Sequence, residues 1–87
     1  MSKGGLRMID RLKGKKVVGF KQSLRAIKSG TGKKVYIAKD ADNKLVEEVK
    51  IAAQYNSLDI VYIDTMKELG KLCGIEVGAA TAVILNE

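Results

Sequence analysis

The stretch VVGFKQSLRAIKSG, residues 17–30, carries groups that suit the binding of a phosphate backbone. A short apolar run reaches Gly19, and a glycine at a strand end lets the backbone approach a ligand closely. The predicted helix that follows begins with unpaired N–H groups and the positive end of its dipole. Together these features form a natural binding site for a phosphate.

Four side chains of the segment after Gly19 add to such a site. Lys21 and Arg25 are four residues apart and therefore share a helical face. Gln22 can donate and accept hydrogen bonds together, which contact with a base edge requires, and Lys28 adds a further cation. Taken alone, the pattern also fits a solvated helix face, so the rest of the chain has to separate the two interpretations.

Two acidic residues at a predicted strand end, Asp40 and Asp42 in the sequence AKDADN, could in principle hold Mg²⁺. The simpler interpretation is a turn in which one aspartate caps the next helix. The chain has no histidine, which removes the commonest general base and zinc ligand. We therefore expect a protein without catalytic activity, bound metal or cofactor.

The sequence SGTGKK, residues 29–34, superficially resembles a phosphate-binding loop but fails its requirements. A Walker loop needs a glycine where this chain has Ile27 and a serine or threonine where it has Lys34. It also lies between a strand and a helix, whereas the order predicted here is helix, loop, strand. We interpret the segment as a basic turn.

Charge is distributed unevenly along the chain, whose formal net charge is +6. Residues 1–39 contain 12 of the 16 lysines and arginines and one acid, a net of +11, whereas residues 40–87 contain 4 bases and 9 acids, a net of −5. This asymmetry favours a surface that faces a polyanion, unless the fold interleaves the two halves. A membrane is the weaker candidate, because no basic amphipathic segment shows a clear aromatic or leucine-rich face.

The length of 87 residues suits one domain, residues 1–87, with a real but thin core. Cys73 is the single cysteine and fits a helical core position in a reducing compartment. No apolar run approaches the roughly 18 residues of a membrane span, and the N-terminus lacks the apolar centre of a signal peptide. We therefore expect a cytoplasmic protein, and we expect it to be a monomer because nothing in the sequence requires a dimer.

Hydrophobic periodicity divides the chain into short elements separated by glycines. Thr65 and Glu68 form a capping box at one helix start. The sequence predicts helices over residues 5–12, 22–30, 41–56 and 65–74 and strands over residues 15–20, 33–40, 58–64 and 81–86. Alternating strands and helices imply a sheet covered on both faces. We therefore predict an α/β fold, a three-layer α/β/α sandwich with a central four-stranded mixed sheet.

The segments GFKQSLRAIKSG, VYIAKDAD and LGKLCGIEVGAATAVI occur in an order and spacing that resemble the kink-turn RNA-binding family of small ribosomal proteins. More narrowly, the chain is similar to the bacterial ribosomal-protein-like branch, which is related to the archaeal protein called seven-A-e. The resemblance covers roughly residues 3–86 and implies the same α/β/α sandwich. It also implies binding to the kink-turn, a sharply bent RNA helix with tandem sheared G·A pairs.

The resemblance assigns major-groove contacts to the start of the helix in the opening stretch. By matching position, Gly19, Phe20, Lys21 and Gln22 would line the groove, with Gln22 nearest the guanine edges. Arg25 matches a basic residue one turn later that contacts a phosphate.

The resemblance also assigns roles to an acidic turn and an apolar loop. Asp40 and Asp42 match the turn that contacts the extruded nucleotide. An unstacked base can rest against the low apolar surface of Val77 and its small neighbours; the alternative is a hinge that tucks Ile75 and Val77 into the core. The loop that covers the flipped-out bases in the family corresponds to Ile75, Glu76, Val77, Gly78, Ala79 and Ala80.

The chain departs from the archaeal and eukaryotic members, which usually carry Asn-Glu where it has Lys21-Gln22. A glutamate only accepts hydrogen bonds and so selects guanine N–H donors, whereas a glutamine binds in either sense. We expect phosphate contacts to supply a larger share of the RNA-binding energy, which would make RNA affinity depend more strongly on salt. Gly78 loosens a loop that is often alanine-rich, so we expect weaker RNA affinity than in the archaeal relatives.

The sequence thus predicts a non-catalytic protein that recognises and stabilises kink-turn RNA by shape, G·A edges and backbone contacts. Its partner would be ribosomal RNA, a riboswitch or another structured RNA. The alternatives are a structural protein of the large ribosomal subunit that acts in assembly, an RNA-processing enzyme with a metal at the two aspartates, and a protein-only adaptor that uses the acidic half.

Overall fold

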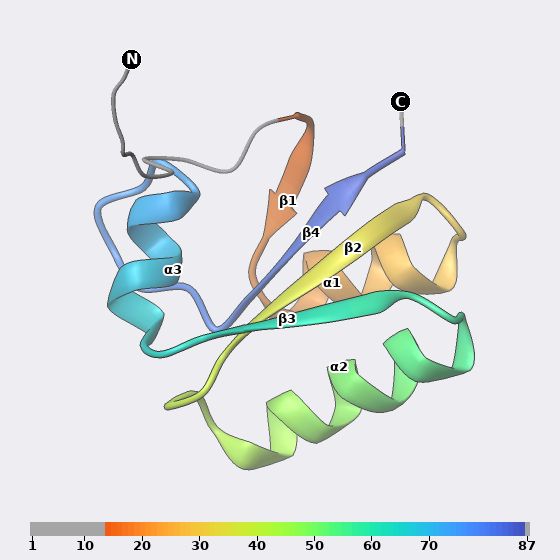
Figure 1. The fold of residues 1–87 in the computed structure, drawn as a ribbon, viewed down its shortest axis with the longest axis horizontal. Coiled ribbons are helices and arrows are strands. Elements are labelled where there is room, and N and C mark those ends of the chain that lie inside the picture. Colours follow the sequence, from red (N-terminus) through yellow and green to blue (C-terminus); the bar gives the residue numbers. More distant parts are fainter. Residues whose placement is uncertain (1–13, 87) are drawn as a thin grey trace.

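Strands and helices alternate along residues 14–86, the part of the chain that the computed structural model describes (Figure 1). The elements are β1 (Lys16–Val18), α1 (Phe20–Lys28), β2 (Gly32–Ala38), α2 (Asn43–Tyr55), β3 (Asp59–Ile63), α3 (Met66–Leu72) and β4 (Thr81–Leu85). Each overlaps a predicted element, but α1 begins at Phe20, which the sequence assigned to the preceding strand, because that strand ends before Gly19. The predicted helix over residues 5–12 lies outside the described residues. None of the helices in the described range is long and apolar enough to cross a membrane.

The sheet has the strand order β1-β4-β2-β3. β4 runs antiparallel to β1 and β2, and β2 runs parallel to β3, so the predicted mixed sheet is confirmed. In consequence β1, β2 and β3 all end, and β4 begins, at the same end of the sheet (Figure 1). We call this the carboxyl end of the sheet, because three strand C-termini and the segments that follow them meet there.

Helices cover both faces of the sheet, which confirms the predicted three-layer sandwich. α1 and α2 pack on one face over a core that includes the fully buried Ile27, Val49 and Val83. α3 packs on the other face, where Leu69 and Ala82 are fully buried. The two cores hold α1 and α3 on opposite sides of the carboxyl end.

A buried hydrogen bond connects α1 to the start of β4. The Thr81 hydroxyl donates to the Ser23 hydroxyl over 2.8 Å, and both side chains are fully buried. Thr81→Val leaves Ser23 without this partner, so we expect the free energy of unfolding to fall by about 1–3 kcal/mol in urea denaturation. The double variant Ser23→Ala/Thr81→Val should recover part of the loss, because neither polar group then remains buried. A Thr81→Val protein as stable as the parent would contradict this role.

Candidate nucleic-acid interface

Gly19 shapes the start of α1. As the N-cap residue it has φ 106° and ψ 160°, a region that only glycine adopts readily. Its N–H donates to the Thr81 carbonyl over 2.9 Å, and its carbonyl accepts the Ser23 N–H. Among residues 14–86, no side chain caps the start of α1. The N–H groups of the first turn, at the positive end of the helix dipole, are therefore available to an anion.

Three polar side chains surround this helix start. Lys21, Gln22 and Arg25 are exposed, and their side chains form no hydrogen bond or ion pair with any residue in the range 14–86. The first turn of α1 carries no acidic residue. Phe20 is half-buried and packs against the core beneath the helix, so it holds the helix start in place. The site is therefore positively charged and open.

The predicted acidic turn follows β2. An Asp42 carboxylate oxygen accepts the Lys44 N–H over 2.8 Å and caps α2, which confirms the capping interpretation. An Asp40 carboxylate oxygen accepts the Met66 N–H over 2.8 Å at the start of α3. Both aspartates are exposed, and no group of three or more potential metal ligands occurs in the described part of the chain. Each carboxylate therefore supports a helix start.

The loop over residues 75–80 crosses α3 in direct backbone contact. The Ile75 N–H donates to the Gly70 carbonyl over 3.0 Å, and the Ala79 N–H donates to the Met66 carbonyl over 3.0 Å. Gly70 is buried, and a Cβ atom at this position would overlap the Val77 carbonyl oxygen. The sequence pattern does not assign Gly70 to the site, although a glycine inside a predicted helix often has a packing reason.

The side chains of this loop divide into buried and exposed ones. Val77 is 70 % exposed, so the alternative that places it in the core is wrong. Ile75 is half-buried and packs on the α3 face, as that alternative expected. Glu76 and Gly78 are exposed, whereas Ala79 is 3 % exposed and belongs to the core. Val77 and its two exposed neighbours thus form the accessible surface of the loop.

Hydrogen bonds join the three segments at the carboxyl end of the sheet. The Ala38 N–H donates to the Ala80 carbonyl over 2.9 Å, which connects the end of β2 to the loop. With the bonds already described at Gly19 and Asp40, this contact brings the α1 start, the acidic turn and the loop together. Lys28 lies apart from them, because it is the last residue of α1 and is about 12 Å along the helix axis from Phe20.

The single thiol lies on the α3 face. Cys73 packs against the core there, as the sequence predicted. Burial raises the pKa of the Cys73 thiol, and the Lys16 ammonium offsets part of this rise. A raised pKa reduces the thiolate present at neutral pH, so the group is suited to packing and poorly suited to nucleophilic chemistry.

An α/β/α sandwich with an uncapped, cation-flanked helix start at one end of a mixed sheet defines a small polyanion-binding domain. The chain belongs to the Ribosomal protein L7Ae/L30e/S12e/Gadd45 family, whose sequence profile matches residues 7–87. The predicted membership of this family of small ribosomal proteins is confirmed.

Two relatives of the chain are named RNA-binding proteins. The chain is 52% identical over 75 residues to RNA-binding protein TTE2299 of Caldanaerobacter subterraneus subsp. tengcongensis, covering 86% of this chain and 92% of that protein. It is 46% identical over 73 residues to RNA-binding protein YbxF of Geobacillus stearothermophilus, covering 84% of this chain and 89% of that protein.

A solved structure shares the fold. The Giardia lamblia 15.5kD RNA binding protein superimposes with a TM-score of 0.77 at 26% identity, over 83% of this chain. The match spans 61% of the Giardia chain, so that protein has further residues without a counterpart in the match.

Proposed function

We propose that this chain is a non-catalytic, monomeric RNA-binding protein of the cytoplasm, in which residues 1–87 form one domain that recognises and stabilises kink-turn motifs. RNA binding is supported by the family and by relatives that are named RNA-binding proteins. The observation that carries the kink-turn proposal is the position of the uncapped α1 start beside the exposed Val77 loop.

The start of α1 suits a bent RNA helix better than a straight one. The major groove of straight A-form RNA is deep and narrow, so side chains cannot read its base edges. A kink opens that groove to the first turn of α1, where backbone N–H groups and Lys21 would contact phosphates. Gln22 would reach the guanine edges of the G·A pairs, and Arg25 would contact a phosphate one turn further along.

The loop and the acidic turn suit nucleotides that have left the stack. Val77 offers an exposed apolar surface on which an unstacked base can rest. Glu76, Asp40 and Asp42 carry carboxylates that only accept hydrogen bonds, so they would face base N–H or ribose hydroxyl groups and not phosphates. The protein would bind the kinked form of an RNA that samples both forms, and binding would thereby stabilise the bend.

Gln22→Ala tests the base contact. Removing one base contact is expected to weaken binding to kink-turn RNA by about 1–3 kcal/mol. Titrations of a kink-turn RNA and of a straight duplex of equal length, in moderate salt and Mg²⁺, measure the preference. Gln54→Ala is the control, because Gln54 is an exposed glutamine on α2 away from the site. Equal affinity of the parent for both RNAs would refute the proposal, and unchanged binding by Gln22→Ala would refute the assigned contact.

Arg25→Gln tests the phosphate contact. The variant should weaken binding to both RNAs alike and reduce the slope of log affinity against log salt by about one, since one phosphate contact is lost. Titrations at several salt concentrations give this slope. Lys71→Gln removes an exposed cation from the last turn of α3 and should leave the slope unchanged. If the slope of log affinity against log salt is the same for Arg25→Gln and the parent, Arg25 contacts no phosphate and belongs to a solvent-exposed face of α1.

A further inference from the structure

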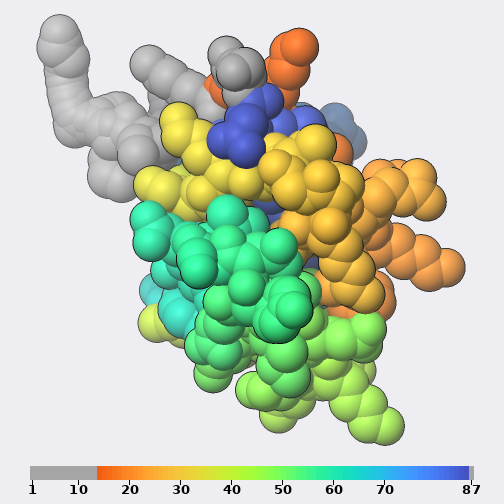
Figure 2. Space-filling model, turned by 90° about the vertical axis from the view of Figure 1, so that its right-hand side faces the viewer, coloured from red at the N-terminus to blue at the C-terminus, as the bar shows by residue number. Residues whose placement is uncertain are grey.

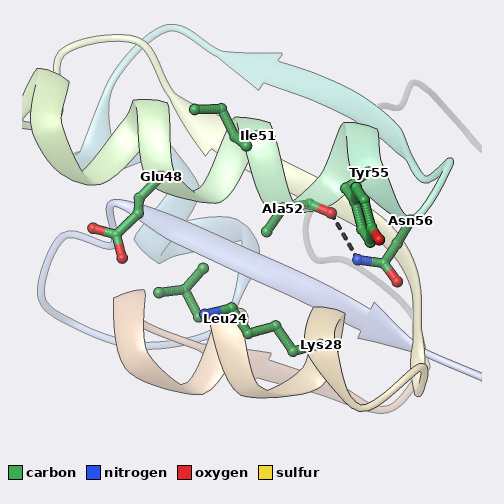
Figure 3. A pocket seen from close by; sticks show the side chains of 7 residues that line it. All are labelled: Leu24, Lys28, Glu48, Ile51, Ala52, Tyr55 and Asn56. Atoms are coloured by element: carbon green, nitrogen blue, oxygen red, sulfur yellow. Dashed lines mark hydrogen bonds between the residues drawn. The ribbon is translucent and has the colours of Figure 1, made fainter.

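We infer a second RNA contact, for one unpaired nucleotide, in the groove between α1 and α2. This inference rests on the RNA-binding part of the proposed function and not on its kink-turn part. The groove has a volume of about 430 Å³ and lies on the outer side of the two helices, facing away from the sheet (Figure 3). It contains Lys28, the one predicted site residue that the structure separates from the others.

An exposed aromatic ring forms one wall of the groove. Tyr55 is 89 % exposed and Ile51 is 61 % exposed, and Leu24 of α1 lies opposite them (Figure 3). A tyrosine ring with one free face gives a stacking surface for a base of any sequence. Single exposed apolar residues are common, but here the ring, an aliphatic neighbour and a cation line the same groove.

One cation lies within the groove. The Lys28 side chain runs back along α1, so that its ammonium nitrogen lies beside Leu24, between Tyr55 at one end of the groove and Glu48 at the other (Figure 3). Lys28 also continues the cations of α1, since Lys21, Arg25 and Lys28 follow each other at helical spacing. The nine residues of α1 span about 13 Å. An RNA strand that leaves the carboxyl end of the sheet can therefore follow these cations to the groove.

The Tyr55 end of the groove coincides with the C-termini of α1 and α2, whose last carbonyl groups would repel a phosphate. Donors cover two of these carbonyls. The hydroxyls of Ser29 and Thr31 each lie 3.2 Å from the Ala26 carbonyl oxygen, to which they donate. The Asn56 Nδ2 donates to the Ala52 carbonyl oxygen over 2.8 Å, as the dashed line in Figure 3 shows. The Asn56 Oδ1 is left to accept a base N–H.

The two loops at this end lie side by side. Figure 2 shows the molecule from this side, and in that view the loop after α1, in gold, lies above the loop after α2, in green. Close to these loops, Gly32 at the start of β2 lies near Leu58, since a Cβ added at Gly32 would be 3.4 Å from the Leu58 side chain. A second copy is the weaker occupant, because an aromatic side chain buries about 150–250 Å² and a stable interface needs about 800 Å² on each partner.

The test compares kink-turn RNA with the same RNA carrying a short single-stranded oligouridine extension at either end. For the parent, one of the two extensions is expected to tighten binding about tenfold, the effect of one stacked base. Tyr55→Phe should keep this gain, whereas Tyr55→Ala and Lys28→Gln should lose it. Two controls should keep it: Tyr62→Ala, which removes a 45 % exposed tyrosine from β3, and Lys71→Gln on α3.

Three outcomes would overturn the inference. The first is a parent that gains nothing from either extension. The second is a gain that Tyr62→Ala removes as fully as Tyr55→Ala does. The third is a concentration-dependent dimer in sedimentation that Tyr55→Ala abolishes, which would assign the groove to a second copy. Binding of the unextended RNA tests the kink-turn proposal separately. Free oligouridine, titrated by NMR against the tyrosine ring signals, tests the groove even if kink-turn RNA is not bound.

Discussion

Gly70→Ala is expected to destabilise the protein by about 3 kcal/mol, although the substitution improves helix propensity. In an exposed helix, alanine is about 1 kcal/mol more favourable than glycine. At position 70, however, the added Cβ would overlap the Val77 carbonyl oxygen, which is backbone and not the end of a flexible side chain. Overpacking of this kind forces backbone shifts that cost energy. The sign of the measured change in the free energy of unfolding therefore shows whether helix propensity or close packing has the larger effect at position 70.

Urea denaturation gives the change in the free energy of unfolding for Gly70→Ala. Lys71→Ala is the matched control, because it lies next in the same helix and is exposed, so its effect should stay within about 0.5 kcal/mol. The loop must move to relieve the overlap, so the NMR signals of the Val77 methyl groups should shift as well. A stabilised Gly70→Ala protein with unshifted Val77 signals would show that the loop does not rest on α3.

The elements and layers of this fold are predictable because their signals are local. Apolar spacing marks each strand and helix, and glycines mark three of the six breaks between them. The capping box of Thr65 and Glu68 is present, with the Glu68 N–H donating to the Thr65 hydroxyl over 3.0 Å. Asp42 likewise caps the helix that directly follows it. Each of these features depends on residues within a few positions of one another.

The strand order and the contacts that assemble the site are not local, so the sequence pattern does not contain them. Nothing in the residues of β4 indicates that it inserts between β1 and β2. The hydrogen bond between Ser23 and Thr81 joins positions 58 residues apart, and that between Asp40 and Met66 joins positions 26 residues apart. Residues at such separations meet only because the sheet brings strand ends together.

Hydrophobic periodicity also does not predict which side chains of the loop over residues 75–80 are buried and which are exposed. Ile75 and Val77 are similar β-branched residues two positions apart, yet one is half-buried and the other is exposed. An irregular loop has no repeating geometry that assigns side chains to a face. The path of the loop over α3 makes that assignment, and it depends on the missing side chain of Gly70.

Gly19→Ala is expected to reduce affinity for kink-turn RNA roughly 100-fold, which corresponds to about 2.7 kcal/mol. Apart from the two chain neighbours of Gly19, no atom of residues 14–86 lies within 4 Å of a Cβ at this position, so these residues do not exclude the methyl group. The φ of +106° does disfavour it, at a cost of about 1–3 kcal/mol in stability. In the proposed complex the methyl group would also enter the space through which the RNA backbone approaches the first N–H groups of α1.

Gly30→Ala separates the two effects, because it repeats the backbone strain without the proposed RNA contact. Gly30 has φ +79° and follows the other end of α1, and within the described part of the chain an added Cβ would also meet no atom within 4 Å beyond its chain neighbours. Both variants should lose stability, by about 1–3 kcal/mol each. With both proteins folded, only Gly19→Ala should lose affinity for unextended kink-turn RNA. Equal losses of affinity in the two variants would mean that strain in α1, and not the exposed helix start, controls RNA binding.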